Sequence, residues 1–143
     1  MRGKSAVSEA QLRGLADFRA TLRGFLHFSE AAAARVGLTS QQHQLMLQIA
    51  GAPEDVVITV GYLAERLALR HNSAVELCNR CEAAGWIARY RFAENRRLVT
   101  LRLTSAGKEL LDELSIDHFR ELKQLAPKLI RVLNVISKQQ ETS

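Results

Sequence analysis

The sequence predicts a mainly α-helical fold with one small β-hairpin. Apolar residues recur every three or four positions over most of the 143-residue chain, which is typical of amphipathic helices. The composition also favours helix, because the chain contains only two prolines while Leu, Ala, Arg and Glu dominate. Between residues 86 and 103 the pattern changes to one typical of β-strands. The length indicates a single domain with one hydrophobic core.

A long first helix is expected from Ser8 to Val36. Ser8 and Gln11 have the spacing of a capping box at its start, and Gly37 supplies a stop. About 28 residues would make a helix on the order of 40 Å long. A compact domain of this size cannot cover such a helix unaided, so we expect its apolar stripe to continue onto another chain.

A second helix and one short strand are expected next. Thr39 and Gln42 form another capping-box pattern, and apolar residues follow it until Gly51 ends the helix. The β-branched run Val56–Ile58 then predicts one small strand.

Two further helices are predicted around a turn at residues 68–72. Thr59 is the expected N-cap of the third helix. The fourth helix runs to Ala84, with Gly85 as its stop and with His71, Asn72 or Ser73 as its N-cap.

A β-hairpin and two C-terminal helices complete the prediction. The strands are Trp86–Tyr90 and Leu98–Leu103, and the polar stretch Arg91–Arg97 forms the tip between them. Thr104 caps the next helix, and Pro127 fits the first turn of a separate last helix. A polar tail starts at Lys138.

The positive charge of the chain is concentrated between Arg66 and Arg102. This stretch contains eight arginines and three acids, which accounts for the formal net charge of +5 of the whole chain. Arginine suits bidentate contact with phosphate and guanine. The predicted order of elements is helix, turn, helix and then an Arg-tipped hairpin, which is typical of a winged helix-turn-helix. Such a fold binds double-stranded DNA with one helix in the major groove and the hairpin tip at the adjacent minor groove and backbone.

The stretch from Leu38 to Gly107 resembles the MarR family of bacterial transcriptional regulators. The segments that carry the resemblance are Leu38–Gln42, Thr59–Ala64, Ala74–Arg89, Asn95–Arg97 and Leu103–Gly107. It implies one MarR-type domain over residues 1–143, with dimerisation helices at 6–37 and 105–140 and a DNA-binding lobe at 38–104. It further implies a homodimer on a palindromic operator, and a repressor released by a small amphipathic or phenolic effector.

The predicted DNA-binding residues follow from this resemblance and from the charge. They are Thr59, Arg66, Arg70, His71, Asn72, Ser73, Val75, Glu76, Asn79, Arg80, Asn95, Arg96 and Arg97. Base edges are expected to be read by Asn72, Ser73, Glu76 and Asn79 or Arg80, and phosphates to be bound by Thr59, Arg66, Arg70, Arg96 and Arg97.

Two of these positions depart from the family's pattern. Asn95 stands where the family's wing has Asp, which anchors a basic side chain by charge, so we expect weaker wing order and a freer Arg97. Glu76 could accept a hydrogen bond from cytosine N4, or pair with Arg80 one turn later, and we favour the pair.

The predicted dimerisation residues are Leu15, Phe18, Leu22, Leu122, Leu125, Leu129, Val132 and Ile136. The effector site stays unspecified. His27, His43 and His118 are candidate contacts, because the resemblance places them on helices that border the family's ligand pocket.

Other functional classes find little support. Cys78 and Cys81 have the spacing of a redox motif, but redox-sensing relatives use a cysteine elsewhere, so we expect two small buried side chains. The sequence shows no metal-spaced histidine pair and no catalytic motif, so no metal, cofactor or enzymatic activity is expected. It has no signal peptide and no apolar run of about 18 residues, which predicts a cytoplasmic protein without a membrane partner. The alternative function is a winged-helix protein-interaction or small-molecule-binding module without DNA binding.

Overall fold

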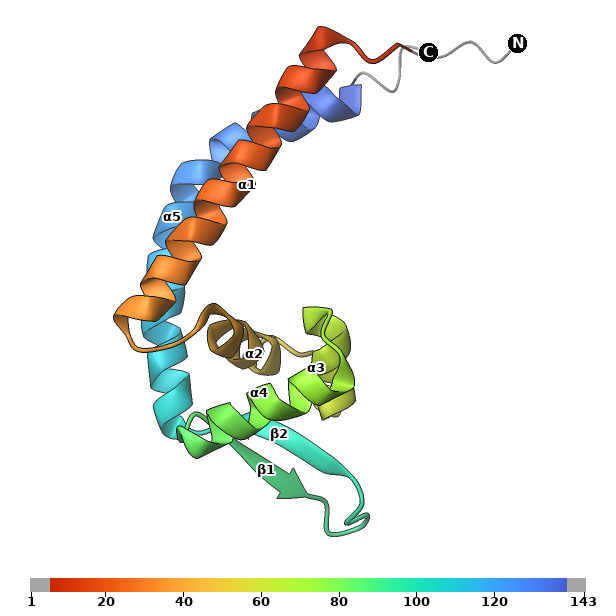
Figure 1. Cartoon of the computed structure of the whole chain (residues 1–143), viewed down its shortest axis with the longest axis vertical. Helices are drawn as coiled ribbons and strands as arrows, with labels where there is room; N and C mark the ends of the chain where they lie inside the picture. Colours follow the sequence, from red (N-terminus) through yellow and green to blue (C-terminus); the bar gives the residue numbers. More distant parts are fainter. Residues whose placement is uncertain (1–5, 139–143) are drawn as a thin grey trace, which may run out of the picture. The chain divides into compact units, whose positions relative to one another are not determined.

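The computed structural model describes residues 6–138 and confirms a mainly helical fold with one antiparallel hairpin (Figure 1). The elements in order are α1 (Glu9–Arg35), α2 (Ser40–Ala50), α3 (Val60–Leu67), α4 (His71–Ala83), β1 (Ile87–Arg91), β2 (Val99–Leu103) and α5 (Ser105–Lys138). The chain divides into two compact units. The central unit is Ala32–Ile116, and the terminal unit consists of the described residues before Ala32 and after Ile116.

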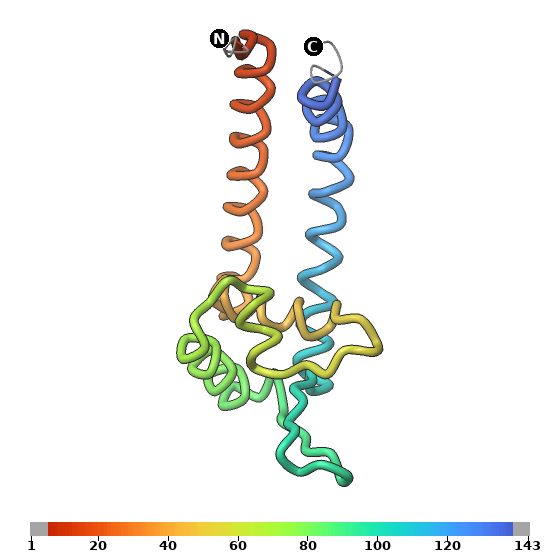
Figure 2. Tube along the Cα trace, turned by 90° about the vertical axis from the view of Figure 1, so that its right-hand side faces the viewer, coloured from red at the N-terminus to blue at the C-terminus, as the bar shows by residue number. Residues whose placement is uncertain are grey.

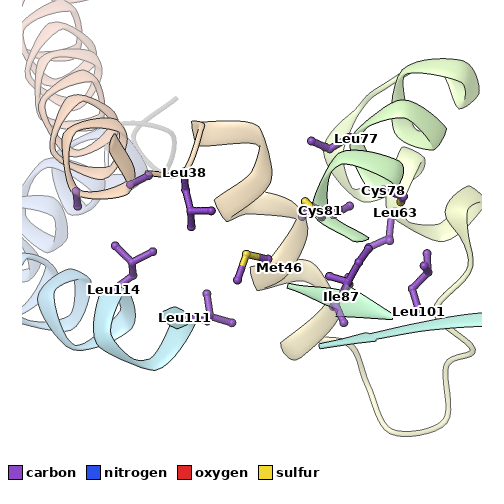
Figure 3. Close-up of a cluster of buried hydrophobic side chains, with 14 residues drawn as sticks. Leu38, Met46, Leu63, Leu77, Cys78, Cys81, Ile87, Leu101, Leu111 and Leu114 are labelled. Atoms are coloured by element: carbon purple, nitrogen blue, oxygen red, sulfur yellow. The ribbon is translucent and has the colours of Figure 1, made fainter. Parts of the chain in front are cut away.

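The core of the central unit joins α2, α3, α4, the hairpin and the first turns of α5 (Figure 3). Leu45, Leu63 and Leu101 have no exposed surface, and Leu111 and Leu114 contribute from α5. Burial of each such leucine contributes roughly 1.5–3 kcal/mol. This apolar cluster fixes how the helices and the hairpin of the unit are arranged.

Helix α4 enters this core along one stripe. Ala74, Leu77, Cys78 and Cys81 are buried, and residues three or four apart lie on the same side of a helix. The opposite side of α4 is therefore held in solvent.

The hairpin is tied to the start of α5. β1 and β2 pair antiparallel, from Ile87 opposite Leu103 to Arg91 opposite Val99. The Thr104 hydroxyl donates to the Gly85 carbonyl oxygen at 2.6 Å and accepts from the Gly107 backbone N–H at 3.0 Å. Thr104 thus caps α5, as predicted, and anchors it to the turn between α4 and β1.

The predicted helix signals at four other positions are confirmed. Ser8 and Thr39 each exchange hydrogen bonds with a glutamine three residues later, which completes both capping boxes. Thr59 accepts from the Tyr62 backbone N–H at 3.0 Å. Gly85 follows α4 with a φ of 84°, the left-handed conformation that glycine adopts without strain.

Two predictions in the central unit are wrong. Val56–Ile58 forms no strand, because its one bond to the hairpin, from the Leu101 N–H to the Ile58 oxygen at 2.8 Å, does not make a ladder. The N-cap of α4 is Arg70, without a side-chain cap bond, and not His71, Asn72 or Ser73. Ala68 ends α3 in the left-handed conformation, which lets the next helix begin at once.

The predicted break before Pro127 is also wrong, because α5 is one helix of 34 residues with Pro127 inside it. Proline removes one backbone donor and crowds the preceding turn, but Leu125 and Leu129 beside it are half-buried and Val132 is buried, so burial of these apolar side chains favours the continuous helix. The predicted tail beyond Lys138 lies outside the described residues.

In the terminal unit, the described parts of α1 and α5 run side by side (Figure 2). Gly14 is buried, and a Cβ there would lie 3.4 Å from a side-chain carbon of Ile136. His118 Nε2 lies 2.8 Å from the Ser29 hydroxyl, and its ring meets Phe25 and Phe28 edge to face. Over residues 6–138, no helix combines the length and apolarity that a membrane span requires.

The anchor between α5 and the hairpin predicts a steric limit at Gly107. A Cβ there would lie 2.1 Å from the Trp86 carbonyl oxygen, a backbone atom that cannot move alone. Gly107→Ala should therefore lower the free energy of unfolding by about 1–3 kcal/mol. Gly61→Ala is the matched control, because a Cβ at Gly61 meets no atom closer than 3.7 Å. Denaturant unfolding measures both, and equal stability of the two variants would contradict this account.

Candidate nucleic-acid interface

The solvent side of α4 presents a row of polar side chains. The predicted positions that are exposed on it are His71, Asn72, Ser73, Glu76, Asn79 and Arg80. Val75, also predicted, is half-buried. The buried stripe through Leu77 and Cys81 fixes this orientation, so the polar row is a consequence of the core packing.

Three further predicted residues lie on or next to α3 and precede α4 in the chain. The Thr59 hydroxyl is used as the cap of α3. Arg66 donates from Nε to Gln48 Oε1 on α2 at 2.8 Å, which leaves the two terminal amino groups of its guanidinium for another acceptor. Arg70 is exposed at the N-cap position of α4.

The hairpin tip is closed by hydrogen bonds to backbone atoms. Arg91 Nη1 donates to the Arg96 carbonyl oxygen at 2.7 Å, and Asn95 Oδ1 accepts from the Arg97 backbone N–H at 3.2 Å. Arg96 and Arg97 are both exposed. The tip extends beyond the helices of the central unit in both views (Figures 1 and 2). Asn95 therefore helps to close the tip through a hydrogen bond, although it lacks the charge of the Asp that the family has at this position.

Arg89 makes two contacts with α4 that the sequence did not predict. Arg89 of β1 donates from Nη1 to Glu82 Oε1 at 2.6 Å and from Nη2 to Asn79 Oδ1 at 2.9 Å. In the sequence, Arg89 is one of eight arginines in the positively charged stretch and has no feature that distinguishes it. Its contacts with α4 form only because β1 lies beside that helix in the folded protein.

The favoured ion pair between Glu76 and Arg80 is wrong. Among the described residues no ion pair joins them, although their spacing allows one. An exposed pair of this kind contributes at most about 0.5 kcal/mol, so solvation competes with it effectively. Glu76 thus remains an exposed acid among the polar residues of α4.

The predicted dimerisation residues lie on the two helices of the terminal unit. Leu15 and Leu122 are exposed, at 53% and 37%, while Val132 is buried and the other predicted positions are half-buried. Further exposed apolar residues on the same helices are Leu12, Leu26, Phe119, Ile130 and Leu133. Exposed apolar side chains therefore recur along both described helices of this unit.

The three candidate effector histidines lie in different surroundings. His27 is exposed and lines a groove of about 300 Å³ on α1 with Arg19, Arg23 and Glu30. His43 is buried in the central unit, at 2% exposure. His118 is held by Ser29 and two phenylalanine rings. Their role as ligand contacts stays a prediction.

Both cysteines are buried in the core, as the sequence predicted. Burial raises the pKa of the Cys81 thiol to about 11, and the neighbouring Cys78 adds to this effect. Burial also raises the pKa of Cys78, opposed by Arg89 and reinforced by Glu82. The thiolate is the reactive form of cysteine, so neither side chain has the character of a redox sensor.

The fold and the exposed face define a winged helix-turn-helix protein. Residues 36–98 match the family model described as MarR family. The resemblance is thereby confirmed, and this region of the chain belongs to the MarR family. No curated protein matches the chain.

Several solved structures share the fold. A MarR family protein from Bacillus stearothermophilus has a TM-score of 0.72 at 19% identity, over 95% of this chain and 97% of that one. MepR from S. aureus has a TM-score of 0.68 at 18% identity, over 95% of each chain. A mutant of MarR from E. coli complexed with operator DNA has a TM-score of 0.64 at 19% identity, over 85% of this chain and 88% of that one.

The burial of the thiols predicts that they are protected in the folded protein. Native protein should react with a thiol reagent at pH 8 far more slowly than protein unfolded in denaturant, because the pKa of both groups is raised. The raised pKa of Cys81 also makes the free energy of unfolding depend on pH. In the unfolded chain this thiol loses its proton near pH 9, and in the folded protein only near pH 11. The free energy of unfolding should therefore be unaffected by this group below about pH 9 and should fall as the pH rises from 9 towards 11. Rapid labelling of either cysteine at pH 8 without unfolding would contradict this.

Proposed function

We propose that this protein is a sequence-specific DNA-binding transcriptional regulator that acts as a homodimer. The observation that carries the proposal is the exposed polar row of α4. In the chain, Arg66 and Arg70 precede this row, and the Arg-tipped hairpin follows it. A helix of this kind enters the major groove with its N-terminal residues at the base edges. The hairpin tip then lies at the adjacent backbone or minor groove.

The comparisons support a DNA partner. One similar structure is a mutant of MarR complexed with operator DNA, and another is a mutant of MepR bound to an oligodeoxyribonucleotide. Phosphate contacts from the exposed arginines would supply salt-dependent affinity. Side chains of α4 would supply base discrimination.

The exposed apolar side chains of the terminal unit support the proposed dimer. Two copies would cover the exposed side chains of α1 and α5 and place two α4 helices on consecutive half-sites of a palindromic operator. A repressor of this design releases DNA when a small effector binds the conformation that does not fit the operator. The effector is proposed to be amphipathic or phenolic, and no cofactor is needed.

An interaction module without DNA binding is the alternative. The exposed carboxylate of Glu76 favours it, because an acid on the face of α4 repels phosphate. Binding of the purified protein to the DNA upstream of its own gene, at two salt concentrations, separates the two functions. Sequence preference with a steep salt dependence supports the regulator, and absence of binding supports the module.

The wing tip gives one prediction. Arg97→Ala should weaken DNA binding and reduce the slope of log affinity against log salt by about 1, because it removes one phosphate contact. The fold should be unchanged, since only the backbone of Arg97 makes the closing bond of the tip. Arg120→Ala is the control, because its side chain is 76% exposed and lies in the terminal unit. If Arg97→Ala binds normally while Asn72→Ala abolishes binding, the wing does not contact DNA.

The dimer gives another prediction. Leu15→Asp should convert the protein to a monomer, measured by light scattering, because Leu15 is 53% exposed in the single chain and lies in the expected interface. The helical content should remain, since the change affects little of the chain's own packing. Leu47→Asp is the matched control in the central unit, at 39% exposure. A Leu15→Asp variant that stays dimeric would remove this face from the interface.

A further inference from the structure

Glu76 is an acid in the middle of the face of α4 that points away from the core. The buried stripe of this helix is centred close to Ala74, which has no exposed surface. Asn72 and Glu76 each lie two residues from Ala74, so at about 100° per residue both project roughly 160° away from it. A molecule that covers the exposed face of α4 therefore meets the Glu76 side chain.

The Glu76 carboxylate is not engaged by the protein itself. Within the part of the chain that the structure describes, it makes no ion pair or hydrogen bond. Arg80, one turn later, does not pair with it, and Arg89 donates to Glu82 and Asn79 instead. An ionised carboxylate can only accept hydrogen bonds. Once α4 is covered, Glu76 therefore needs a donor from the molecule that covers it.

The major groove of DNA offers such a donor at only two bases. The amino groups at cytosine N4 and adenine N6 donate there, whereas guanine and thymine present acceptors. Adenine also presents the acceptor N7 beside its amino group, which repels the second oxygen of a carboxylate, while the groove edge of cytosine has no acceptor. A carboxylate that loses its water and finds no donor destabilises the complex. Cytosine is therefore the base that suits Glu76.

We propose that Glu76 is a specificity-determining residue that accepts a hydrogen bond from N4 of a cytosine, so that one base pair of each operator half-site is C·G in a fixed orientation. The inference rests on the proposed DNA-binding function and deepens it. The same carboxylate is repelled by phosphates, so it lowers the affinity for DNA of any sequence while it discriminates between sequences.

The first test is a selection of duplexes from a randomised pool by the full-length protein. Wild type should favour the C·G pair about tenfold at one position of each half-site, which is within the range for one good base contact. Glu76→Ala should lose this preference and keep those at the other positions. Glu113→Ala is the matched control, because Glu113 is an exposed acid on α5, and it should select the wild-type sequence.

The second test measures the affinity for a duplex without an operator. Glu76→Ala should bind such a duplex more tightly than wild type, because a negative charge at the phosphates has been removed. Its advantage should shrink as salt is added. Glu113→Ala removes the same charge from α5 and should gain less. An equal gain for the two variants would show that Glu76 does not face DNA.

The third test changes one atom of the DNA. N4-methylcytosine keeps the N4 hydrogen that pairs with guanine and has a methyl group in place of the one that faces the major groove. Placing it at the selected cytosine should weaken wild-type binding several-fold and Glu76→Ala binding hardly at all. Equal weakening of both proteins would show that Glu76 does not contact this amino group, which overturns the inference.

The outcomes separate this inference from the function on which it rests. If wild type selects a sequence but Glu76→Ala alters no position or alters all of them, the inference fails and the regulator stands. The same holds if the position that Glu76→Ala alters is not C·G in the wild-type selection. If wild type selects no sequence at all, the proposed function itself fails, and the inference falls with it.

Discussion

The burial of one stripe of α4 is the constraint on which the central unit depends. Leu77, Cys78 and Cys81 are fixed against α2, α3 and the hairpin, and a helix with one side anchored has no freedom to rotate about its axis. The polar side is thereby presented to solvent, and Arg89 of β1 binds two of its residues, Asn79 and Glu82. The same burial raises the pKa of the Cys81 thiol and so favours its protonated form. Burial of this stripe therefore determines both the orientation of α4 and the low reactivity of its cysteines.

The local features of the fold were predictable because each depends on neighbours in sequence. Thr39 and Thr59 cap their helices through N–H groups three residues away, and Gly85 needs only its own freedom to adopt a positive φ. The single hydrogen bond at Ile58 shows the limit of this reasoning, because a β-branched run becomes a strand only when a partner edge is available. Pro127 shows it as well, since tertiary packing outweighs one missing donor.

The candidate interface likewise has features that the sequence predicts and one contact that it does not predict. The exposed face of α4 and the charged tip could be derived from periodicity and charge, because both properties are read along the chain. The contact of Arg89 with Asn79 and Glu82 could not, since it joins side chains from a strand and a helix at a distance that only the folded unit defines. Arginines that look equivalent in sequence thus have separate tasks: Arg89 supports the helix, while Arg97 is left exposed.

The closing bonds of the hairpin tip have a consequence for how this protein can diversify. Arg91 and Asn95 hold the loop through the main chain of Arg96 and Arg97, whose side chains take no part in shaping it. Exchanging those two side chains would alter the chemistry presented at the tip while its geometry stays the same. The tip is therefore a natural place for evolution, or for an engineer, to retune target choice without rebuilding the scaffold.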